Sequence, residues 1–240
     1  MADPEHVVLA KSGANAIARW REVNHVIPAT PSPHTLNYQL GDRAASETFE
    51  PELVYGRPKL DLSGAFLSRA KLGGADLAFD ELNGVDLTSS NLRLAELQGA
   101  NLNSAHLSRS NLSHAILTRA NMARCVLTRS NLSRSTLRAT YLTGADLSSS
   151  DISFANLEGA NLSRANLSSA DLTGADLTGA DLSGVDFSNT RMYGARQQSW
   201  TRWSPGVDPA AEGVVSRVLD DADAVCDLSA FGDCQAADLN

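Results

Sequence analysis

Several residue types capable of catalysis occur in this chain of 240 residues, but none has a catalytic arrangement. The histidines have no cysteine or acidic residue at the spacing that metal ligation needs. Serine and aspartate recur at regular intervals, a use typical of turns rather than of a single reactive site. The sequence contains no glycine-rich phosphate or dinucleotide motif. We therefore expect a protein that is not an enzyme and that holds no cofactor and no metal.

Arginines in the middle of the chain have a distribution that could serve binding. Between Glu96 and Asp146 the sequence contains no acidic residue, yet it contains six arginines. Concentrated guanidinium groups can bind carboxylates or phosphates, or they can form a solvated surface that prevents aggregation. We call this set the basic belt: Arg109, Arg119, Arg124, Arg129, Arg134 and Arg138.

Carboxylates gather on either side of the basic belt. Several acidic residues precede it, and four aspartates follow it at intervals of five residues. These aspartates are a second candidate surface for binding a partner. We call them the acidic ring: Asp171, Asp176, Asp181 and Asp186.

The overall composition argues against several function classes. The formal net charge of −8 removes the general electrostatic case for direct binding to nucleic acid or to an anionic membrane. There is no run of 18 apolar residues, so we expect no membrane-spanning helix. The first residues lack the pattern of a secretory signal, and three cysteines are too few for a disulfide framework. A cytoplasmic protein is the expectation.

A five-residue repeat organises the chain and must position these charged groups. From Leu62 to Met192 every fifth residue is large and apolar, which gives 27 consecutive positions, 23 of them leucine. A small residue, usually alanine, stands two positions earlier, and Asp or Asn usually lies between the two. A period of five fits neither an α-helix nor a β-strand. The pattern predicts a solenoid of very short strands and turns with Leu and Ala inside.

Serine indicates the length of one coil of this solenoid. Ser90, Ser110, Ser130 and Ser150 take the small inward position at intervals of 20 residues. Coils of that length would stack these serines about 4.8 Å apart. We expect four repeats in each coil and a rod of roughly 32 Å. On that rod the acidic ring places one carboxylate on each of four faces, and the basic belt surrounds the middle.

Residues 60–194 resemble the pentapeptide repeat proteins in their unit, A-(D/N)-L-(S/T)-x. The resemblance implies an all-β solenoid, namely a right-handed quadrilateral β-helix. Relatives that confer quinolone resistance or inhibit gyrase act by mimicking DNA, so the resemblance implies a type II topoisomerase such as DNA gyrase as the partner. The basic belt departs from those relatives, which look negative along much of the rod.

The segments on either side of the repeats are expected to cap the rod, because exposed sheet edges promote aggregation. Residues 1–59 are predicted to form an N-terminal cap and linker, with a helix over 6–23 that ends before a proline-rich run. Residues 195–240 are predicted to form a C-terminal cap with a helix over 210–225. This second cap is also a candidate element for homodimerisation.

Two residues at inward positions are exceptions to the pattern. Asp80 takes a small inward position, where an unpaired carboxylate is costly, so we expect either a local bulge or a bond to the N-terminal segment. Cys125 is expected to be a small core residue. Cys226 and Cys234 are close enough in sequence to bridge, although a cytosolic setting favours free thiols.

Together these features predict a non-enzymatic β-helix, capped by helices, that binds another macromolecule. A type II topoisomerase is the expected partner, which the protein would protect or inhibit. The alternative is a structural or scaffolding rod in which the caps carry the binding.

Overall fold

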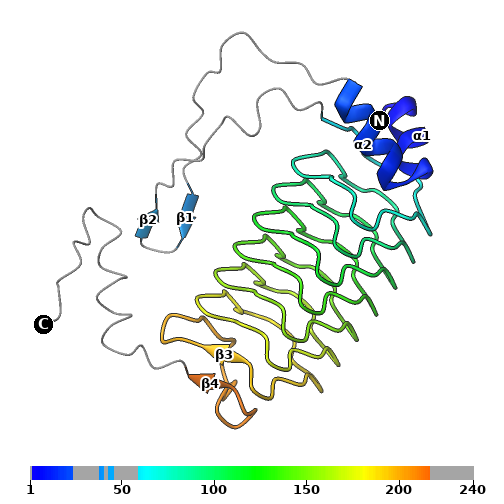
Figure 1. Ribbon diagram of the computed structural model, residues 1–240. Coiled ribbons are helices and arrows are strands. Elements are labelled where there is room, and N and C mark those ends of the chain that lie inside the picture. Colours follow the sequence, from blue (N-terminus) through cyan, green and yellow to red (C-terminus); the bar gives the residue numbers. More distant parts are fainter. Residues whose placement is uncertain (1, 24–37, 41–42, 46–58, 217–240) are drawn as a thin grey trace, which may run out of the picture.

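The computed structural model describes residues 2–23, 38–40, 43–45 and 59–216 (Figure 1). Strands β1 (Tyr38–Leu40) and β2 (Arg43–Ala45) pair in antiparallel fashion. Strands β3 (Arg196–Gln197) and β4 (Val215–Ser216) pair in parallel. Residues 61–196, which follow the first strand pair in the chain, wind into a solenoid. Neighbouring coils of the solenoid are joined by isolated parallel bridges rather than by long strands.

Successive coils of the solenoid are aligned in one constant register. Asp61 bridges Glu81, Glu81 bridges Asn101, and the same step continues at four positions in each coil. Backbone hydrogen bonds join the coils, as where the Leu102 N–H donates to the Asn121 carbonyl at 2.7 Å. The predicted coil of four repeats, 20 residues long, is therefore confirmed. One extra residue enters only at the end, where Asp181 bridges Arg202.

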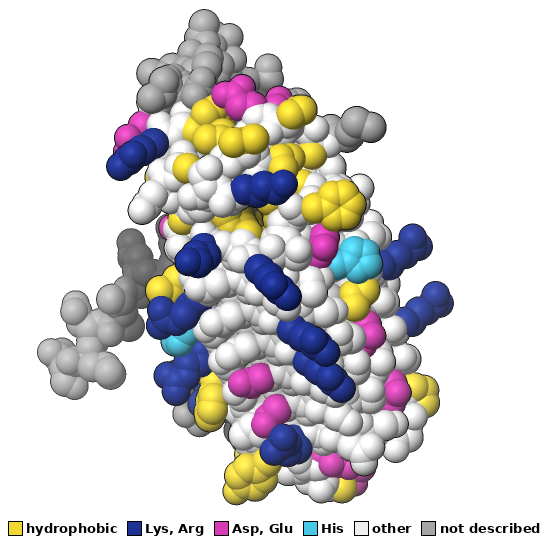
Figure 2. All heavy atoms as spheres, turned by 90° about the vertical axis from the view of Figure 1, so that its right-hand side faces the viewer, with side chains coloured by type: hydrophobic (Ala, Val, Ile, Leu, Met, Phe, Trp, Pro, Cys, Tyr) yellow, Lys and Arg dark blue, Asp and Glu magenta, His cyan; other side chains and the backbone are white. Residues whose placement is uncertain are grey.

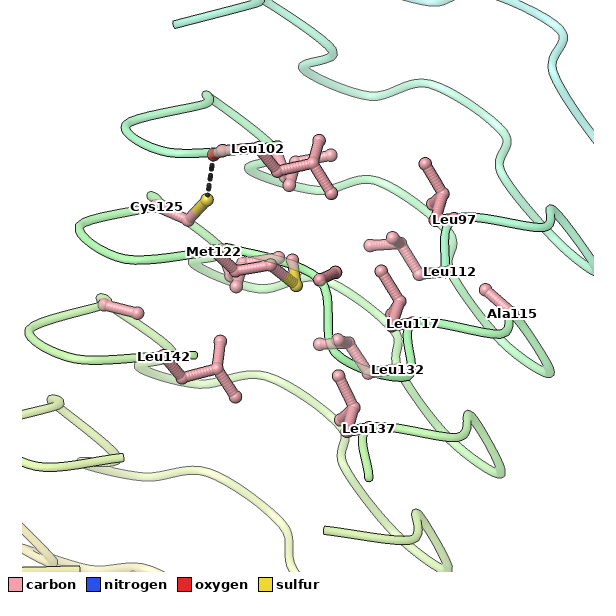
Figure 3. Packing of buried hydrophobic residues seen from close by; sticks show 14 of the residues in the cluster. Leu97, Leu102, Leu112, Ala115, Leu117, Met122, Cys125, Leu132, Leu137 and Leu142 are labelled. Carbon is pink, nitrogen blue, oxygen red and sulfur yellow. Dashed lines mark hydrogen bonds between the residues drawn. The ribbon is translucent and has the colours of Figure 1, made fainter. Parts of the chain in front are cut away.

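Leucine and alanine fill the interior, as the repeat predicts. The leucines of the repeat are almost fully buried, and those of neighbouring coils stack in columns (Figure 3). Cys125 belongs to this core, and its Sγ donates to the Leu102 carbonyl at 2.8 Å. Burial raises the pKa of the Cys125 thiol to about 12, so the thiol stays protonated. Most inward serines donate their hydroxyls within the same turn, as where Ser130 donates to the Leu127 carbonyl at 2.6 Å, whereas the buried Ser90 hydroxyl has no hydrogen-bond partner among the described residues.

Each corner of the rod is a tight turn that places one residue in the left-handed region. In the first turn the Ala65 N–H donates to the Leu62 carbonyl at 3.0 Å, and Gly64 between them has a φ of 69°. This geometry matches a type II turn, whose third residue needs a positive φ. Many corners nevertheless carry a larger residue there, including Arg109 with a φ of 58°.

A pair of helices covers the first coil instead of the single helix predicted over 6–23. Helix α1 (Pro4–Ser12) is capped by Gly13, and helix α2 (Ala14–Val23) begins directly after it. Gly13 has a φ of 92°, and a Cβ there would lie 3.0 Å from the Lys71 carbonyl oxygen. The single-helix prediction was wrong because a left-handed glycine lets the chain turn where it meets the rod.

Polar contacts fasten the helix pair to the first coil and explain Asp80. The Asp80 side chain, only 1% exposed, accepts the Leu60 N–H at 2.9 Å and pairs with Arg21 of α2 at 2.5 Å. Arg21 also donates to the Asp76 carbonyl at 2.9 Å. His6 of α1 accepts the N–H of Asp61 at its Nδ1, at 3.0 Å. The expected bond between Asp80 and the N-terminal segment is confirmed.

The C-terminal helix predicted over 210–225 is wrong for the part that the structure describes. Residues 210–213 form a turn, in which Asp208 Oδ1 accepts the Ala210 N–H at 3.1 Å. The chain then enters β4, where the Val215 N–H donates to the Ala195 carbonyl at 2.7 Å. An edge of the last coil offers free backbone groups, and pairing with them outweighs the local helical pattern. The rest of the predicted helix lies outside the described residues. Cys226 and Cys234, which follow it in the chain, lie outside them as well.

Candidate functional site

The basic belt occupies two successive coils, residues 101–140, and reaches all four corners. Five of its members stand at the left-handed corner position, with φ between 56° and 59°. Arg124 lies at one corner, Arg109 and Arg129 at the next, and Arg134 at the third, diagonally opposite Arg124. Arg119 and Arg138 lie at the fourth corner. The turns therefore project guanidinium groups outward around the middle of the rod.

Much of the belt lacks a compensating carboxylate. Arg138 pairs with Glu158 of the next coil at 3.3 Å. Arg109, Arg124 and Arg129 are exposed and form no ion pair with any described residue. On the face seen in Figure 2, Lys and Arg side chains gather over the middle of the rod. These guanidinium groups are available to an external anion.

Side chains of the acidic ring are engaged within the rod instead. Each aspartate accepts, at Oδ1, the N–H of the residue two positions later, as Asp171 does from Thr173 at 3.0 Å. Arg191 lies 3.7 Å from the Asp171 carboxylate, and Arg202 lies 3.9 Å from that of Asp181. Arg196 stands one coil above Asp176. Three of the four carboxylates thus have an arginine on the neighbouring coil.

Hydrogen bonds in these turns favour the ionised aspartates. The Ser188 hydroxyl and N–H donate to Asp186 Oδ1 at 2.6 and 2.9 Å, and they hold the pKa of Asp186 below its usual value. Partial burial opposes ionisation of Asp171, but hydrogen bonds from Thr173 and the charge of Arg191 leave its pKa lowered as well. These carboxylates contribute to the turns, and they offer less free charge than the belt.

A third surface feature escaped the sequence reasoning. Leu94, Ile116 and Phe154 point outward with 50%, 42% and 59% of their surface exposed. Leu94 and Phe154 share one corner of the rod, because they lie at the same position of coils in one register. The sequence does contain a signal for this column. The outward residues 94, 114, 134 and 154 recur at the same spacing of 20 as the inward serines. We call the column the corner ridge: Leu94, His114, Arg134 and Phe154.

Metal and membrane chemistry find no support within the described ranges. Among these residues, no group of three or more His, Cys, Asp or Glu side chains is placed to hold a metal ion. No helix in the described part of the chain is long and apolar enough to span a membrane.

Family comparison agrees with the coil geometry. The family described as pentapeptide repeats matches in eight copies between residues 72 and 196, which is more than half of the chain. The chain belongs to the pentapeptide repeat family, and its repeats form the β-helical solenoid of that family. No curated protein sequence matches the chain.

Two solved structures illustrate the similarity. A trypsin-treated form of QnrB1, a plasmid-mediated fluoroquinolone resistance protein, aligns with a TM-score of 0.57 over 71% of this chain and 87% of its own, at 14% identity. HetL, a pentapeptide repeat protein involved in heterocyst differentiation regulation from Nostoc sp. strain PCC 7120, is 30% identical over 62% of this chain and 71% of its own, with a TM-score of 0.38. At so low an identity the QnrB1 match establishes a common fold and nothing more.

Proposed function

We propose that this chain is a non-enzymatic rod that binds another protein through the basic belt. The observation that carries the proposal is that Arg109, Arg124 and Arg129, on two successive coils, are exposed and form no ion pair with a described residue. They lie in a stretch that contains no acidic residue. Backbone bonds between the coils fix these corners before any partner arrives, so binding orders little besides the side chains. A carboxylate-rich protein surface is the complementary partner.

A type II topoisomerase, with DNA gyrase first, is the partner that we propose to test. This choice is supported by the fold shared with QnrB1, a fluoroquinolone resistance protein. The bound chain would protect or inhibit the enzyme. Mimicry of DNA would instead use the acidic ring, but three of its four carboxylates stand near arginines of the next coil.

The test replaces three belt arginines that lie on two adjacent corners: Arg109→Ser, Arg129→Ser and Arg134→Ser in one variant. Serine already occupies the same turn position at Ser89 and Ser149, so the fold should tolerate it. Binding to purified gyrase is measured by pull-down, and activity by DNA supercoiling with and without a fluoroquinolone. If the arginine variant loses gyrase binding but keeps the wild-type melting temperature, the result supports the basic belt as the binding surface.

A control variant carries Asp171→Asn, Asp176→Asn and Asp186→Asn, which keep an oxygen acceptor for each turn. If this variant loses gyrase binding and the arginine variant keeps it, the acidic ring makes the contact and the proposed role of the belt is wrong. If the wild type does not bind gyrase, the topoisomerase assignment is wrong.

A further inference from the structure

The belt surrounds the rod, yet one partner can contact only one side of it. We propose that contact is made along the corner ridge and that the partner is an acidic protein segment bearing aromatic or aliphatic side chains between its carboxylates. This inference rests on the proposed function and specifies the side and the chemistry of the contact.

The apolar members of the corner ridge are disfavoured by both their backbone and their exposure. Leu94 and Phe154 have φ values of 60° and 57°, in a region where glycine is easier to accommodate. Glycine does occupy this corner in other coils, at Gly74, Gly174 and Gly194. Both apolar side chains also have at least half of their surface in solvent. Packing over Gly174 accounts for one side of the Phe154 ring. The exposed surface of Leu94 and Phe154 that remains is available to an apolar contact with a partner.

Phe154 and Arg134 are held together before any partner binds. The Arg134 guanidinium lies 5.8 Å from the centre of the Phe154 ring, in cation–π geometry. On the other side the ring packs over Gly174, where a Cβ would lie only 2.7 Å from it. Arginine and aromatic residues are the types that dominate binding energy at protein interfaces. A fixed pair of this kind can bind a carboxylate and an apolar group of a partner side by side.

Surfaces that adjoin the ridge fit the same partner. On one flank lies a ladder of Asn91, Asn111 and Asn131, which continues into the carboxylate of Asp151 beside Phe154. On the other flank Ile116 adds a third exposed apolar group, one coil after Glu96. Arg109 and Arg129 stand at the next corner across the asparagine ladder, within the stretch that has no acid. Exposed guanidinium groups and separate apolar groups thus share this side of the rod, an arrangement that is complementary to an acidic segment with apolar residues between its carboxylates.

The experiment uses two synthetic probes, poly-L-glutamate and the copolymer of glutamate and tyrosine, with the full-length chain. Dissociation constants are measured for the wild type, for Leu94→Ser, and for Leu94→Ser with Phe154→Ser. Phe66→Ser is the matched control, because Phe66 is 78% exposed on another face of the first coil. Melting temperatures show that each variant is folded, and Leu94→Ser alone provides a test that leaves the Phe154 packing intact.

We expect the wild type to bind the copolymer about tenfold more tightly than poly-L-glutamate, as one buried aromatic contact would give. Leu94→Ser should reduce that preference and the double variant should remove it, while Phe66→Ser keeps it. Arg134→Ser should weaken binding more than Arg124→Ser, which changes the same turn position on the opposite corner. The proposed contact along the corner ridge is overturned if the wild type binds the two polymers equally. It is also overturned if the double variant keeps the preference for the copolymer.

The two proposals fail separately in this design. If the triple arginine variant binds both polymers like the wild type, the proposal that the basic belt binds the partner is wrong. This holds whatever the results for the ridge variants. If that variant loses binding but the ridge variants keep the preference for the tyrosine copolymer, only the proposed contact along the corner ridge is wrong. A DNA duplex that binds more tightly than either polymer, and does so through Phe154, would identify a nucleic acid as the partner and overturn the protein assignment.

Discussion

At the residue scale, the corner position explains how this rod combines regular backbone with varied side chains. Each turn requires a positive φ, which glycine adopts at no steric cost and which other residues adopt at about 1–2 kcal/mol. Where a large aromatic residue takes this position, the corner of the next coil is glycine: Phe79 covers Gly99, and Phe154 covers Gly174. The absent Cβ creates the space for the ring.

Replacing Gly174 with alanine should therefore destabilise the rod in two ways. The new Cβ would meet the Phe154 ring at 2.7 Å, and alanine would take a φ of 67°. The control is Gly144→Ala, which has a φ of 65° and nothing within 4 Å of its new Cβ. We expect Gly174→Ala to lose about 1–3 kcal/mol more than the control in urea unfolding. Equal losses would show that the ring does not depend on the glycine.

Asp86 illustrates the carboxylates of the turns and their effect on acid stability. Hydrogen bonds from the Thr88 side chain and N–H lower the pKa of Asp86 in the folded protein. A lowered folded pKa contributes stability that is present above the unfolded value of 3.8 and is lost as pH falls through the folded value. We expect unfolding free energy to be flat from about pH 6 to 5 and to fall below about pH 4. Asp86→Asn should make that acid loss smaller, and an unchanged acid profile would contradict this role.

At the scale of elements, the ends of the rod show how tertiary contacts override local sequence patterns. The apolar spacing of residues 6–23 predicts one helix, but Gly13, with a φ of 92° and little room for a Cβ beside the Lys71 carbonyl, divides the segment into two. Valines at 214 and 215 fit one helical face, yet the open edge of the last coil draws Val215 into β4. Both errors arose where a flanking segment meets the rod, since periodicity reports nothing about such contacts.

The buried pair of Arg21 and Asp80 should be the main polar link between the helix pair and the rod. Removing one member of a buried pair leaves the other charge without its partner, which costs about 3–5 kcal/mol. Arg21→Ala should therefore destabilise the chain strongly in thermal unfolding. Arg19→Ala, at an exposed position on the same helix, should change stability by less than about 0.5 kcal/mol. Similar melting temperatures for the two variants would contradict the importance of the link.

For the whole molecule, the five-residue period of large apolar residues and the regular spacing of the inward serines predicted the architecture. They did so because every coil repeats the same contacts, and one pattern therefore specifies the core, the corners and the register. The positions of the belt arginines followed from that register. The register did not predict that the acidic ring pairs with Arg191 and Arg202, because an ion pair depends on how far side chains reach between coils. The corner ridge was also missed, although its spacing is visible in the sequence.

A cavity in the middle of the rod tests the continuity of the core. Leu132 is fully buried, and Leu132→Ala should cost about 2–5 kcal/mol of unfolding free energy. Leu94→Ala provides the comparison, because Leu94 is half exposed and should lose much less. Urea unfolding of both variants measures the difference. A Leu132→Ala protein as stable as the Leu94→Ala protein would contradict the inward assignment of the repeat.

The central claim is that the basic belt binds an acidic partner, and the salt dependence of that binding tests it most directly. Dissociation constants for poly-L-glutamate are measured from low to physiological salt, for the wild type and for the variant with Arg109→Ser, Arg129→Ser and Arg134→Ser. Exposed charges are screened beyond about 8 Å at physiological ionic strength, so wild-type affinity should fall steeply with salt. The variant should bind weakly, with a shallow slope and an unchanged melting temperature. Identical affinities and slopes for the two proteins would contradict the account.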